Sequence, residues 1–332
     1  MAKRRRRRRS NPTPTVSFNA KDVLNQIRKS HDQSKEVMNE SSKETYSQWG
    51  ISDGSKFYPT FPTTNRLDSG YYELNHSQQT GIFLQRKSVS TDELFSLPST
   101  ELQDILVDIE KFWERVDKYK EYNFIHKRGI LLYGRPGCGK SAIIQLCTQH
   151  LIEEKDGIVI NITNMDQMDW YNRIIGDLRQ VEPERPLIVI MEDLDGLASE
   201  GSWATSMILN LLDGIKQIDN VVYIATTNHP EKLEERITNR PSRFDRRYEV
   251  ELPNEEVRRT YFEKKLTDED LESIDLTEWV DRTHGMSLSH LRELVISVIT
   301  MDNTFEETME RLDGMKRAPK VESGRAKAGF GV

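Results

Sequence analysis

The sequence predicts an α/β fold with a five-stranded parallel sheet covered by helices on both faces, followed by a small all-helical domain. From Gly129 onward, short apolar runs alternate with helical segments, which is the pattern of a buried parallel sheet. After Pro253 the apolar spacing becomes helical and stays so, at 255–266, 276–282 and 288–300. The expected strands are 129–133, 157–162, 187–191, 221–226 and 248–252.

The part of the chain before the sheet has a different composition. Residues 1–80 are rich in Ser, Asn, Thr, Gln and Pro, with a loose helical spacing only at 21–44, so we expect them to be mostly disordered. A short strand at 81–84 and a helix that starts at the capping pair Thr100 and Gln103 lead into the sheet. The expected domains are an extension at 1–80, an α/β domain at 81–253, a helical domain at 254–302 and a flexible tail at 303–332.

The composition argues against a membrane-spanning protein and against a disulfide-rich protein. Charged residues make up 30% of the 332, and no apolar run approaches the roughly 18 residues of a membrane-spanning helix, so we expect no membrane span. The two cysteines, Cys138 and Cys147, are too few for a disulfide framework. A reducing, cytoplasmic compartment is therefore expected.

The net charge of -7 hides an unbroken basic block at the N-terminus, which contains the six arginines from Arg4 to Arg9. The rest of the chain is therefore more acidic than the total suggests, and an acidic body binds polyanions poorly. We expect any nucleic-acid affinity to come from the block. Its other interpretations are a nuclear-type address and a solubilising arm.

One segment matches a phosphate-binding loop. Residues 134–141 fit the pattern G-x-x-x-x-G-K-[ST] between an expected strand and an expected helix, a context that disfavours an incidental Gly-rich turn. In such a loop backbone N–H groups surround the β-phosphate, Lys140 neutralises phosphate oxygens and Ser141 ligates magnesium. We therefore expect ATP and Mg²⁺ as ligands. The expected nucleotide-binding residues are Gly134, Arg135, Pro136, Gly137, Cys138, Gly139, Lys140, Ser141 and Ala142.

A second strand ends in acidic residues. The apolar run 187–191 is followed by Glu192 and Asp193, one of which would serve the magnesium shell while the other orients the attacking water. Alone, this pattern fits a buried strand that ends in a solvated turn equally well, and the loop at 134–141 favours the catalytic interpretation. The expected metal-site residues are Ser141, Glu192 and Asp193.

The order of these motifs resembles the AAA ATPases of the AAA+ superfamily. Thr226-Thr-Asn228 follows at the end of a third strand, and Arg240-Pro-Ser-Arg243 comes after it, so the resemblance covers about residues 91–300. It implies a homo-oligomeric ring, with a hexamer favoured, that hydrolyses ATP to ADP and phosphate. The catalytic residues that it implies are Lys140, Glu192, Asp193, Asn228 as the sensor of the hydrolytic water, and Arg240 and Arg243 as arginine fingers for the neighbouring subunit.

The resemblance also implies an adenine site. Residues 285–289 are similar to the start of a helix in the small domain of this family, and their backbone would lie near the adenine and ribose. Phe124 and Ile125 would lie there too, although core packing explains these two side chains equally well.

Two features depart from the family pattern. Glu192-Asp193 reverses the commonest Asp-Glu order, and the shorter aspartate predicts slow hydrolysis unless the backbone shifts. The same order occurs in the group that includes the Rieske-protein translocase of the inner mitochondrial membrane, so the resemblance does not imply inactivity. Residues 161–186 lack the aromatic-apolar-Gly loop of peptide-threading motors. Met165, Met168, Trp170 and Tyr171 would line a pore instead or pack in the core, and the core is favoured.

We expect the chain to couple ATP hydrolysis to the remodelling of a macromolecular partner, with protein complexes favoured. Two alternatives stay open on the sequence alone. The chain could be a nucleic-acid-associated motor or loader tethered through Arg4 to Arg9, or a nucleotide-gated assembly switch with little turnover.

Overall fold

The computed structural model describes residues 48–52, 56–88, 100–213, 218–240 and 242–315. The chain divides into two units, one up to Thr64 and one from Asn65 onward, and each is described by itself. The first unit contains an antiparallel pair of strands, β1 (Gln48–Ser52) and β2 (Lys56–Thr60). The basic block and the loose helical spacing expected near the N-terminus lie outside the described residues.

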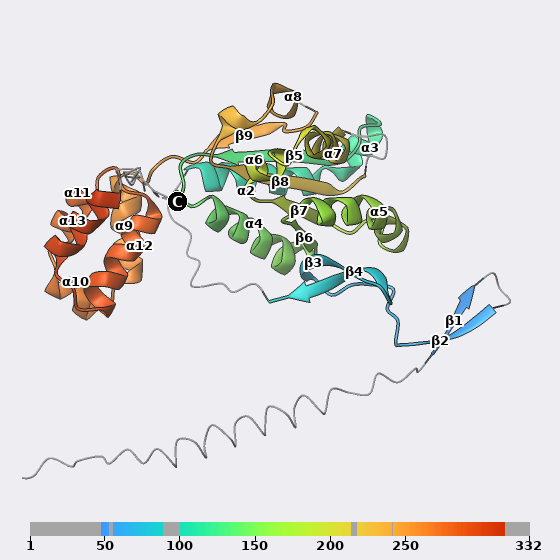
Figure 1. Cartoon of the computed structure of the whole chain (residues 1–332), viewed down its shortest axis with the longest axis horizontal. Coiled ribbons are helices and arrows are strands. Elements are labelled where there is room, and N and C mark those ends of the chain that lie inside the picture. The colour runs from blue at the N-terminus through green and yellow to red at the C-terminus, as the bar shows by residue number, and fades with distance from the viewer. Residues whose placement is uncertain (1–47, 53–55, 89–99, 214–217, 241, 316–332) are drawn as a thin grey trace, which may run out of the picture. The chain divides into compact units, whose positions relative to one another are not determined.

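The second unit is built on a seven-stranded sheet in the order β4-β3-β6-β7-β8-β5-β9 (Figure 1). All neighbours from β3 to β9 are parallel, and β4 at one edge runs antiparallel to β3. The mainly parallel α/β class is therefore confirmed. The strands are β3 (Gly70–Ser77), β4 (Gly81–Lys87), β5 (Lys127–Tyr133), β6 (Ile158–Ile162), β7 (Leu187–Met191), β8 (Val221–Thr227) and β9 (Arg246–Glu249).

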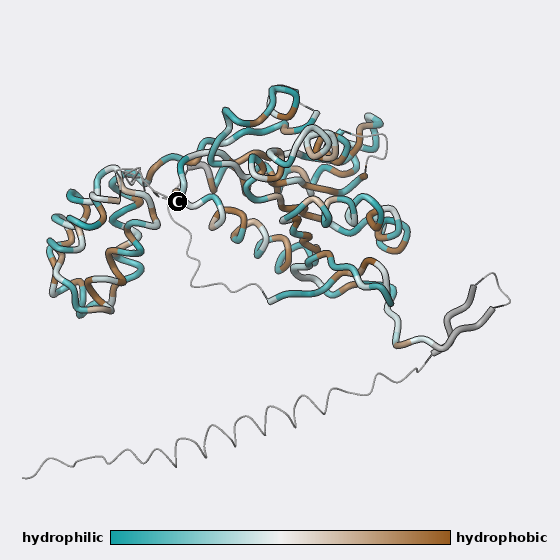
Figure 2. Tube along the Cα trace, viewed as in Figure 1, coloured by the Kyte–Doolittle hydropathy of each residue, from teal (hydrophilic) through white to brown (hydrophobic). Residues whose placement is uncertain are grey.

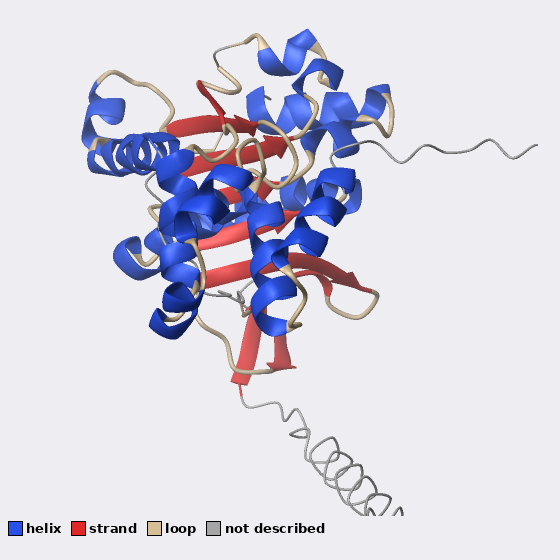
Figure 3. Ribbon diagram, turned by 90° about the vertical axis from the view of Figure 1, so that its left-hand side faces the viewer, coloured by secondary structure: helices blue, strands red, loops and turns tan. Residues whose placement is uncertain are grey.

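Helices cover both faces of the sheet (Figure 3). Helices α5, α6 and α7 pack on one face, while α2 and α4 pack on the other. Because both faces are covered, every residue of β6, β7 and β8 is buried. The helices of this part are α2 (Thr100–Glu114), α3 (Val116–Glu121), α4 (Lys140–Lys155), α5 (Met165–Val181), α6 (Leu194–Ala198), α7 (Ser202–Asp213), the 3₁₀ turn η1 (Pro230–Lys232) and α8 (Glu235–Thr238).

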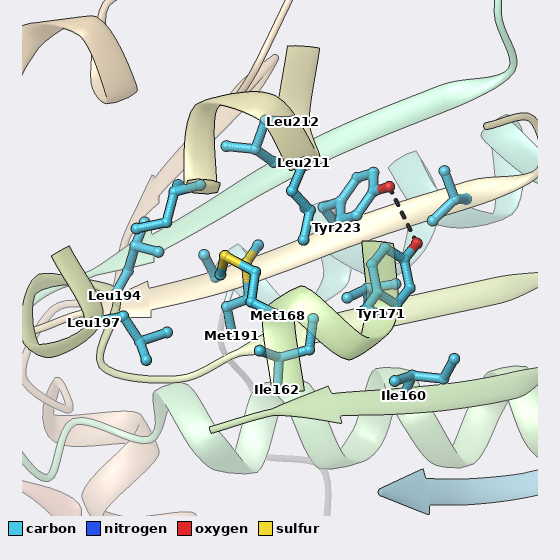
Figure 4. Close-up of a cluster of buried hydrophobic side chains, with 14 of the residues drawn as sticks. Ile160, Ile162, Met168, Tyr171, Met191, Leu194, Leu197, Leu211, Leu212 and Tyr223 are labelled. Carbon is cyan, nitrogen blue, oxygen red and sulfur yellow. Dashed lines mark hydrogen bonds between the residues drawn. The ribbon is translucent and has the colours of Figure 1, made fainter. Parts of the chain in front are cut away.

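The Met and aromatic residues of α5 pack against the sheet beneath that helix. Met165, Met168 and Tyr171 are at most 3% exposed, and Trp170 packs partly buried against the same cluster. Figure 4 shows Met168 and Tyr171 among the other buried side chains of this core. The hydroxyl groups of Tyr171 and Tyr223 are hydrogen-bonded at 3.2 Å. Met165, Met168 and Tyr171 are core residues, so the alternative that they line a pore is wrong for these three, whereas Trp170 is only partly buried. Figure 2 shows the same segregation, with hydrophobic residues along the central strands.

The hairpin β3–β4 corrects the expected strand number from five to seven. β3 joins the parallel sheet beside β6, with Gly70 opposite Ile158. Tyr72 and Leu74 are buried there. The expected boundary at residue 81 therefore falls inside a structural unit, and this part of the 1–80 extension is ordered. The polar residues that alternate with the buried ones made β3 resemble the extension in composition.

A separate group of helices follows the sheet and confirms the expected helical domain, which we call the lid (Figure 1). Its helices are α9 (Glu255–Lys265), α10 (Asp268–Ser273), α11 (Leu276–Arg282), α12 (Leu288–Val295), the π-helical segment η2 (Ile296–Thr300) and α13 (Phe305–Met315). Helix α13 lies within the region expected to be a flexible tail. That expectation is wrong for these residues, because Met309 and Leu312 are 1% exposed in the lid core. The end of the tail, 316–332, lies outside the described residues.

The burial of α13 gives a first testable prediction. Leu312→Ala should lower the free energy of unfolding by about 2–5 kcal/mol, because it leaves a cavity in the lid core. Urea unfolding followed by circular dichroism measures this change. Glu310→Ala on the exposed face of the same helix is the control, with an expected change of about 0.5 kcal/mol or less. Equal unfolding midpoints for the two variants would contradict the packing of α13.

Candidate functional site

The loop between β5 and α4 has a backbone that depends on glycine. Gly134 has a φ of 149°, and a Cβ atom at this position would lie 2.3 Å from the carbonyl oxygen of Val250. Gly139 precedes α4 with a φ of 106°, in the left-handed region that side chains disfavour. The glycines therefore let the chain turn sharply from the end of β5 into the N-terminus of α4, where backbone N–H groups favour an anion.

Lys140 is held at the mouth of this loop by neutral oxygens. Its Nζ donates to the carbonyl oxygens of Gly134 (2.9 Å) and Arg135 (3.0 Å) and to Oδ1 of Asn228 (2.7 Å). The residue is 7% exposed, and burial lowers the pKa of its ammonium. Within the described part of the chain no carboxylate forms an ion pair with it. A buried cation without a counter-ion is costly, and a phosphate group would supply the missing charge.

Ser141 and Glu192 form the second part of the site. The Ser141 hydroxyl donates to Oε2 of Glu192 at 2.5 Å, which joins the first turn of α4 to the end of β7. Magnesium in nucleotide sites is held by one or two protein oxygens together with phosphate oxygens and water. A hydroxyl and a carboxylate this close fit that donor set, and bound Mg²⁺ would neutralise charge on the phosphates.

Asp193 faces a different partner from Glu192. Its backbone has a φ of 50°, and its N–H donates to the Thr226 hydroxyl at 3.1 Å. Its Oδ1 accepts from Nδ2 of Asn228, also at 3.1 Å. Asn228 thus links Lys140 to Asp193. The two carboxylates have different partners, as separate roles toward metal and water require, and the roles themselves stay predictions.

The sheet brings these groups together. β7, β8 and β5 are parallel neighbours, so their carboxyl ends meet at one edge. The loop after β5, the acidic pair after β7 and Asn228 after β8 all lie at that edge. Ligands of open α/β sheets bind at this edge. The expected phosphate, metal and sensor residues therefore form one connected site.

The lid reaches the same loop. The N–H of Ser289 donates to the carbonyl oxygen of Gly137 at 3.3 Å. A Cβ atom on Gly137 would lie 2.8 Å from the Ser287 hydroxyl. The segment expected near the adenine and ribose therefore borders the loop. Phe124 and Ile125 do not, because they precede β5 and lie at its opposite end, and with exposed fractions of 66% and 42% they are not core residues either.

The two arginines expected as fingers differ in burial. Arg240 is exposed and its Nη1 lies 3.1 Å from Oδ2 of Asp213. Arg243 is 9% exposed; it donates to the carbonyl oxygen of Arg236, and its Nε lies 3.6 Å from the same carboxylate. These contacts join Arg240 to the end of α7, and Arg243 to α7 and α8, within the same chain. Arg240, although paired with Asp213, is therefore accessible to another molecule, whereas Arg243 is packed within its own subunit.

Sequence reasoning missed the supporting residues of the site. Thr226 positions Asp193, and the Thr227 hydroxyl donates to Oδ1 of Asp195 at 2.7 Å, which fixes the turn after β7. Asp213, which pairs with both arginines, was missed as well. The threonines directly precede Asn228, so their position at a strand end was a usable signal. Nothing local to Asp213 could have revealed its partners.

Comparison with protein families agrees with this geometry. Residues 130–252 match the model of the ATPase family associated with various cellular activities (AAA). The chain carries an AAA ATPase domain. Such a domain binds ATP, typically with Mg²⁺, and implies ATP hydrolysis. The matched region contains the loop, the acidic strand end, Asn228 and both arginines.

Several curated proteins are similar to this chain. A putative cell division cycle ATPase of Plasmodium falciparum is 27% identical over 64% of the chain and 18% of its own length. The proteasome-activating nucleotidase of Pyrococcus horikoshii is 26% identical over 64% of the chain and 55% of its own length. An AAA ATPase of Corynebacterium diphtheriae described as forming ring-shaped complexes is 26% identical over 55% of the chain and 39% of its own length.

The similarity has a limited extent. The chain spans between about a fifth and just over half of the length of these relatives. Within the helices that the structure describes, none is long and apolar enough to cross a bilayer.

Proposed function

We propose that this chain works as a ring of identical protomers that hydrolyses ATP and uses the turnover to remodel protein complexes. One observation carries the proposal. Lys140, Asn228 and Asp193 form a continuous hydrogen-bonded chain at the carboxyl edge of the sheet, beside the Ser141–Glu192 pair. This arrangement contains the groups that phosphoryl transfer to water needs, apart from a cation at the leaving side of the γ-phosphate.

In the proposed reaction each group has one task. Lys140 would exchange its neutral oxygen partners for β- and γ-phosphate oxygens, and Ser141 with Glu192 would hold Mg²⁺, which would supply charge neutralisation for the phosphates. Asp193 accepts the proton of the attacking water, which Asn228 holds in line with the γ-phosphate. Water attacks phosphorus, the bond to the bridging oxygen breaks, and ADP leaves with inorganic phosphate.

The remaining cation is proposed to come from a second copy of the chain. Arg240 is exposed and lies in the segment between α8 and β9. An arginine offered across an interface stabilises charge on the transferred phosphoryl group and makes hydrolysis depend on assembly. The relative described as forming ring-shaped complexes supports a ring, and a hexamer is the number we propose.

Remodelling without threading is the proposed mode of work. Met165, Met168 and Tyr171 of α5 are core residues and unavailable to grip an unfolded chain. The Glu192-Asp193 order supports a place beside the Rieske-protein translocase group. The buried thiols Cys138 and Cys147 support a reducing, cytoplasmic location.

Concentration dependence tests the proposal. ATP turnover per protomer should rise with protein concentration and level off as rings form, with mass photometry in ATP giving the number of protomers. Lys140→Ala is the control, and it should show background turnover at every concentration. Constant turnover per protomer from a monomer would contradict the ring. Release of a bound partner complex by ATP, and not by ADP, tests remodelling, and equal release by both would contradict it.

A further inference from the structure

A basic and aromatic groove lies far from the ATP site. It has a volume of about 400 Å³ and is formed by α2 and α3 together with the start of β5 and β9. The strand β5 separates it from the phosphate-binding loop, since Arg128 in the groove is at the beginning of the strand and Gly134 follows its end. At about 3.3 Å per residue, this separation is roughly 20 Å. The lining residues are Asp108, Lys111, Phe112, Arg115, Lys118, Tyr119, Tyr122, Phe124, Arg128 and Arg246.

The groove concentrates positive charge in an acidic protein. Arg128 and Arg246 share one carboxylate, Asp108, at 3.2 and 3.5 Å. Three further cations, Lys111 on α2, Arg115 between the two helices and Lys118 on α3, are exposed and line the same groove. None of the three forms an ion pair with another described residue. Five cations therefore face a single carboxylate, which makes this groove a site for an anionic ligand.

Two exposed aromatic rings form the rim of the groove. Tyr122 and Phe124 are 65% and 66% exposed, and their rings are stacked, with centroids 6.3 Å apart and an interplanar angle of 16°. Exposing aromatic rings of this size to water costs free energy. When the two rings stack on each other, the outer face of each stays available to a further planar group. The rim is therefore suited to flat aromatic ligands.

The backbone holds this rim in place. Asn123, between the two aromatics, has a φ of 53°. Its N–H donates to the Lys120 carbonyl at 3.1 Å, and the Phe124 N–H donates to the Tyr119 carbonyl at 2.8 Å. This pair of bonds is the Schellman motif that ends a helix, and asparagine tolerates its left-handed residue. Tyr122 and Phe124 are thus presented by a defined turn.

The floor of the groove is also fixed. Phe112 stacks on His126 with centroids 3.8 Å apart, and Tyr119 packs edge-on against both. His126 is 2% exposed, and its ring nitrogens are hydrogen-bonded to Asn220 and to the Phe112 carbonyl. The aromatic residues Phe112 and Tyr119 of the groove are therefore held by packing and hydrogen bonding around His126.

We propose that this groove binds single-stranded nucleic acid. Phosphates would lie along Lys111, Arg115 and Lys118, while unpaired bases stack on Tyr122 and Phe124. This combination of a cationic track with exposed aromatic faces is how single strands are held without sequence preference. An acidic peptide would satisfy the cations and leave the stacked rings without a partner, so the rim favours bases. The inference goes beyond the proposed function and assigns binding to the body of the protein, where the net charge predicted none.

The test uses the full chain with Arg4 to Arg9 replaced by glutamine, so that the basic block cannot bind the probe. Fluorescence anisotropy measures affinity for a labelled oligothymidylate of about 16 nucleotides over a range of salt concentrations. Tyr122→Ala with Phe124→Ala should weaken binding about tenfold or more. Arg115→Gln with Lys118→Gln should reduce the slope of log affinity against log salt by about 1.4, or about 0.7 for each lost phosphate contact.

Matched control variants distinguish binding in the groove from non-specific binding to other cations of the protein. Arg259→Gln with Lys232→Gln removes two cations outside the groove and should leave the salt slope unchanged. Tyr122→Phe with Phe124→Tyr keeps two rings at the rim and should retain affinity. Unchanged oligonucleotide affinity in both groove variants would overturn the proposal. A second contradicting result would be that the groove variants weaken binding of a glutamate-rich peptide more than binding of the oligonucleotide. A third would be that Arg115→Gln with Lys118→Gln abolishes the oligomeric ring while oligonucleotide binding persists.

Discussion

Arg240→Ala is expected to lower ATP turnover by about 10³-fold or more while ATP affinity stays within a few-fold. The loss follows from the role proposed for an arginine donated across an interface, whose removal typically costs 10³ to 10⁵ in turnover. Because the Arg240 side chain is exposed, the subunit itself should remain folded. Steady-state turnover and equilibrium binding of a fluorescent ATP analogue measure the two quantities.

Arg243→Ala is the informative contrast, because this side chain is buried. Its removal leaves Asp213 and the Arg236 carbonyl without their inner partner, so the free energy of unfolding should fall by about 3 kcal/mol. Loss of activity in this variant should accompany loss of stability. If Arg243→Ala keeps full stability and Arg240→Ala keeps full turnover, the assignment of Arg240 as the exposed finger is wrong.

Mixed assemblies test the trans arrangement. Arg240→Ala supplies intact nucleotide sites, and Lys140→Ala supplies intact arginines. Mixing the two inactive variants should restore a measurable part of the turnover, because some interfaces then pair an intact site with an intact finger. No recovery, in mixtures whose ring formation is verified by mass photometry, would argue against fingers that act between subunits.

Asp193→Asn is expected to lower turnover by about 10²- to 10⁴-fold, the usual contribution of a general base. ATP affinity should change little, because Asp193 is bonded to Asn228 and Thr226 rather than to the loop. Phosphate release under saturating ATP measures the rate. The isosteric amide can still accept a hydrogen bond from Asn228, so the change removes basicity and little else.

Glu192→Gln serves as the control at the neighbouring carboxylate. Its partner is the Ser141 hydroxyl, so this variant should require more Mg²⁺ for half-maximal turnover. The Asp193→Asn variant should not. Equal, background-level rates for the parent chain and Asp193→Asn would contradict hydrolysis and favour the nucleotide-gated assembly switch.

Much of the site could be predicted because its signals are local. The phosphate-binding loop is eight consecutive residues, and Glu192 and Asn228 directly follow apolar strands. Parallel neighbours end at the same edge, so strand order alone brings these groups together. The different partners of Glu192 and Asp193 depend on backbone geometry, including the φ of 50° at Asp193, which no sequence pattern specified.

The missed features depend on distant contacts. Which arginine is buried is decided by Asp213 at the end of α7. β3 is a strand because β6 lies beside it, and α13 is ordered because two apolar residues in a charged segment enter the lid core. The basic groove was hidden by the net charge, because its cations come from α2, α3, β5 and β9 and from Arg115 between the first two, and only their packing brings them together.

The pairing of Gly70 with Ile158 has a consequence for how the chain is made. The ribosome releases the β3–β4 hairpin well before β6, and at about 5–20 residues per second the interval is on the order of ten seconds. During this time the apolar face that carries Leu74 has no sheet to cover it. Newly synthesised chains therefore pass through a stage in which nascent-chain chaperones have a defined segment to bind, and slowing translation between the two strands should prolong it.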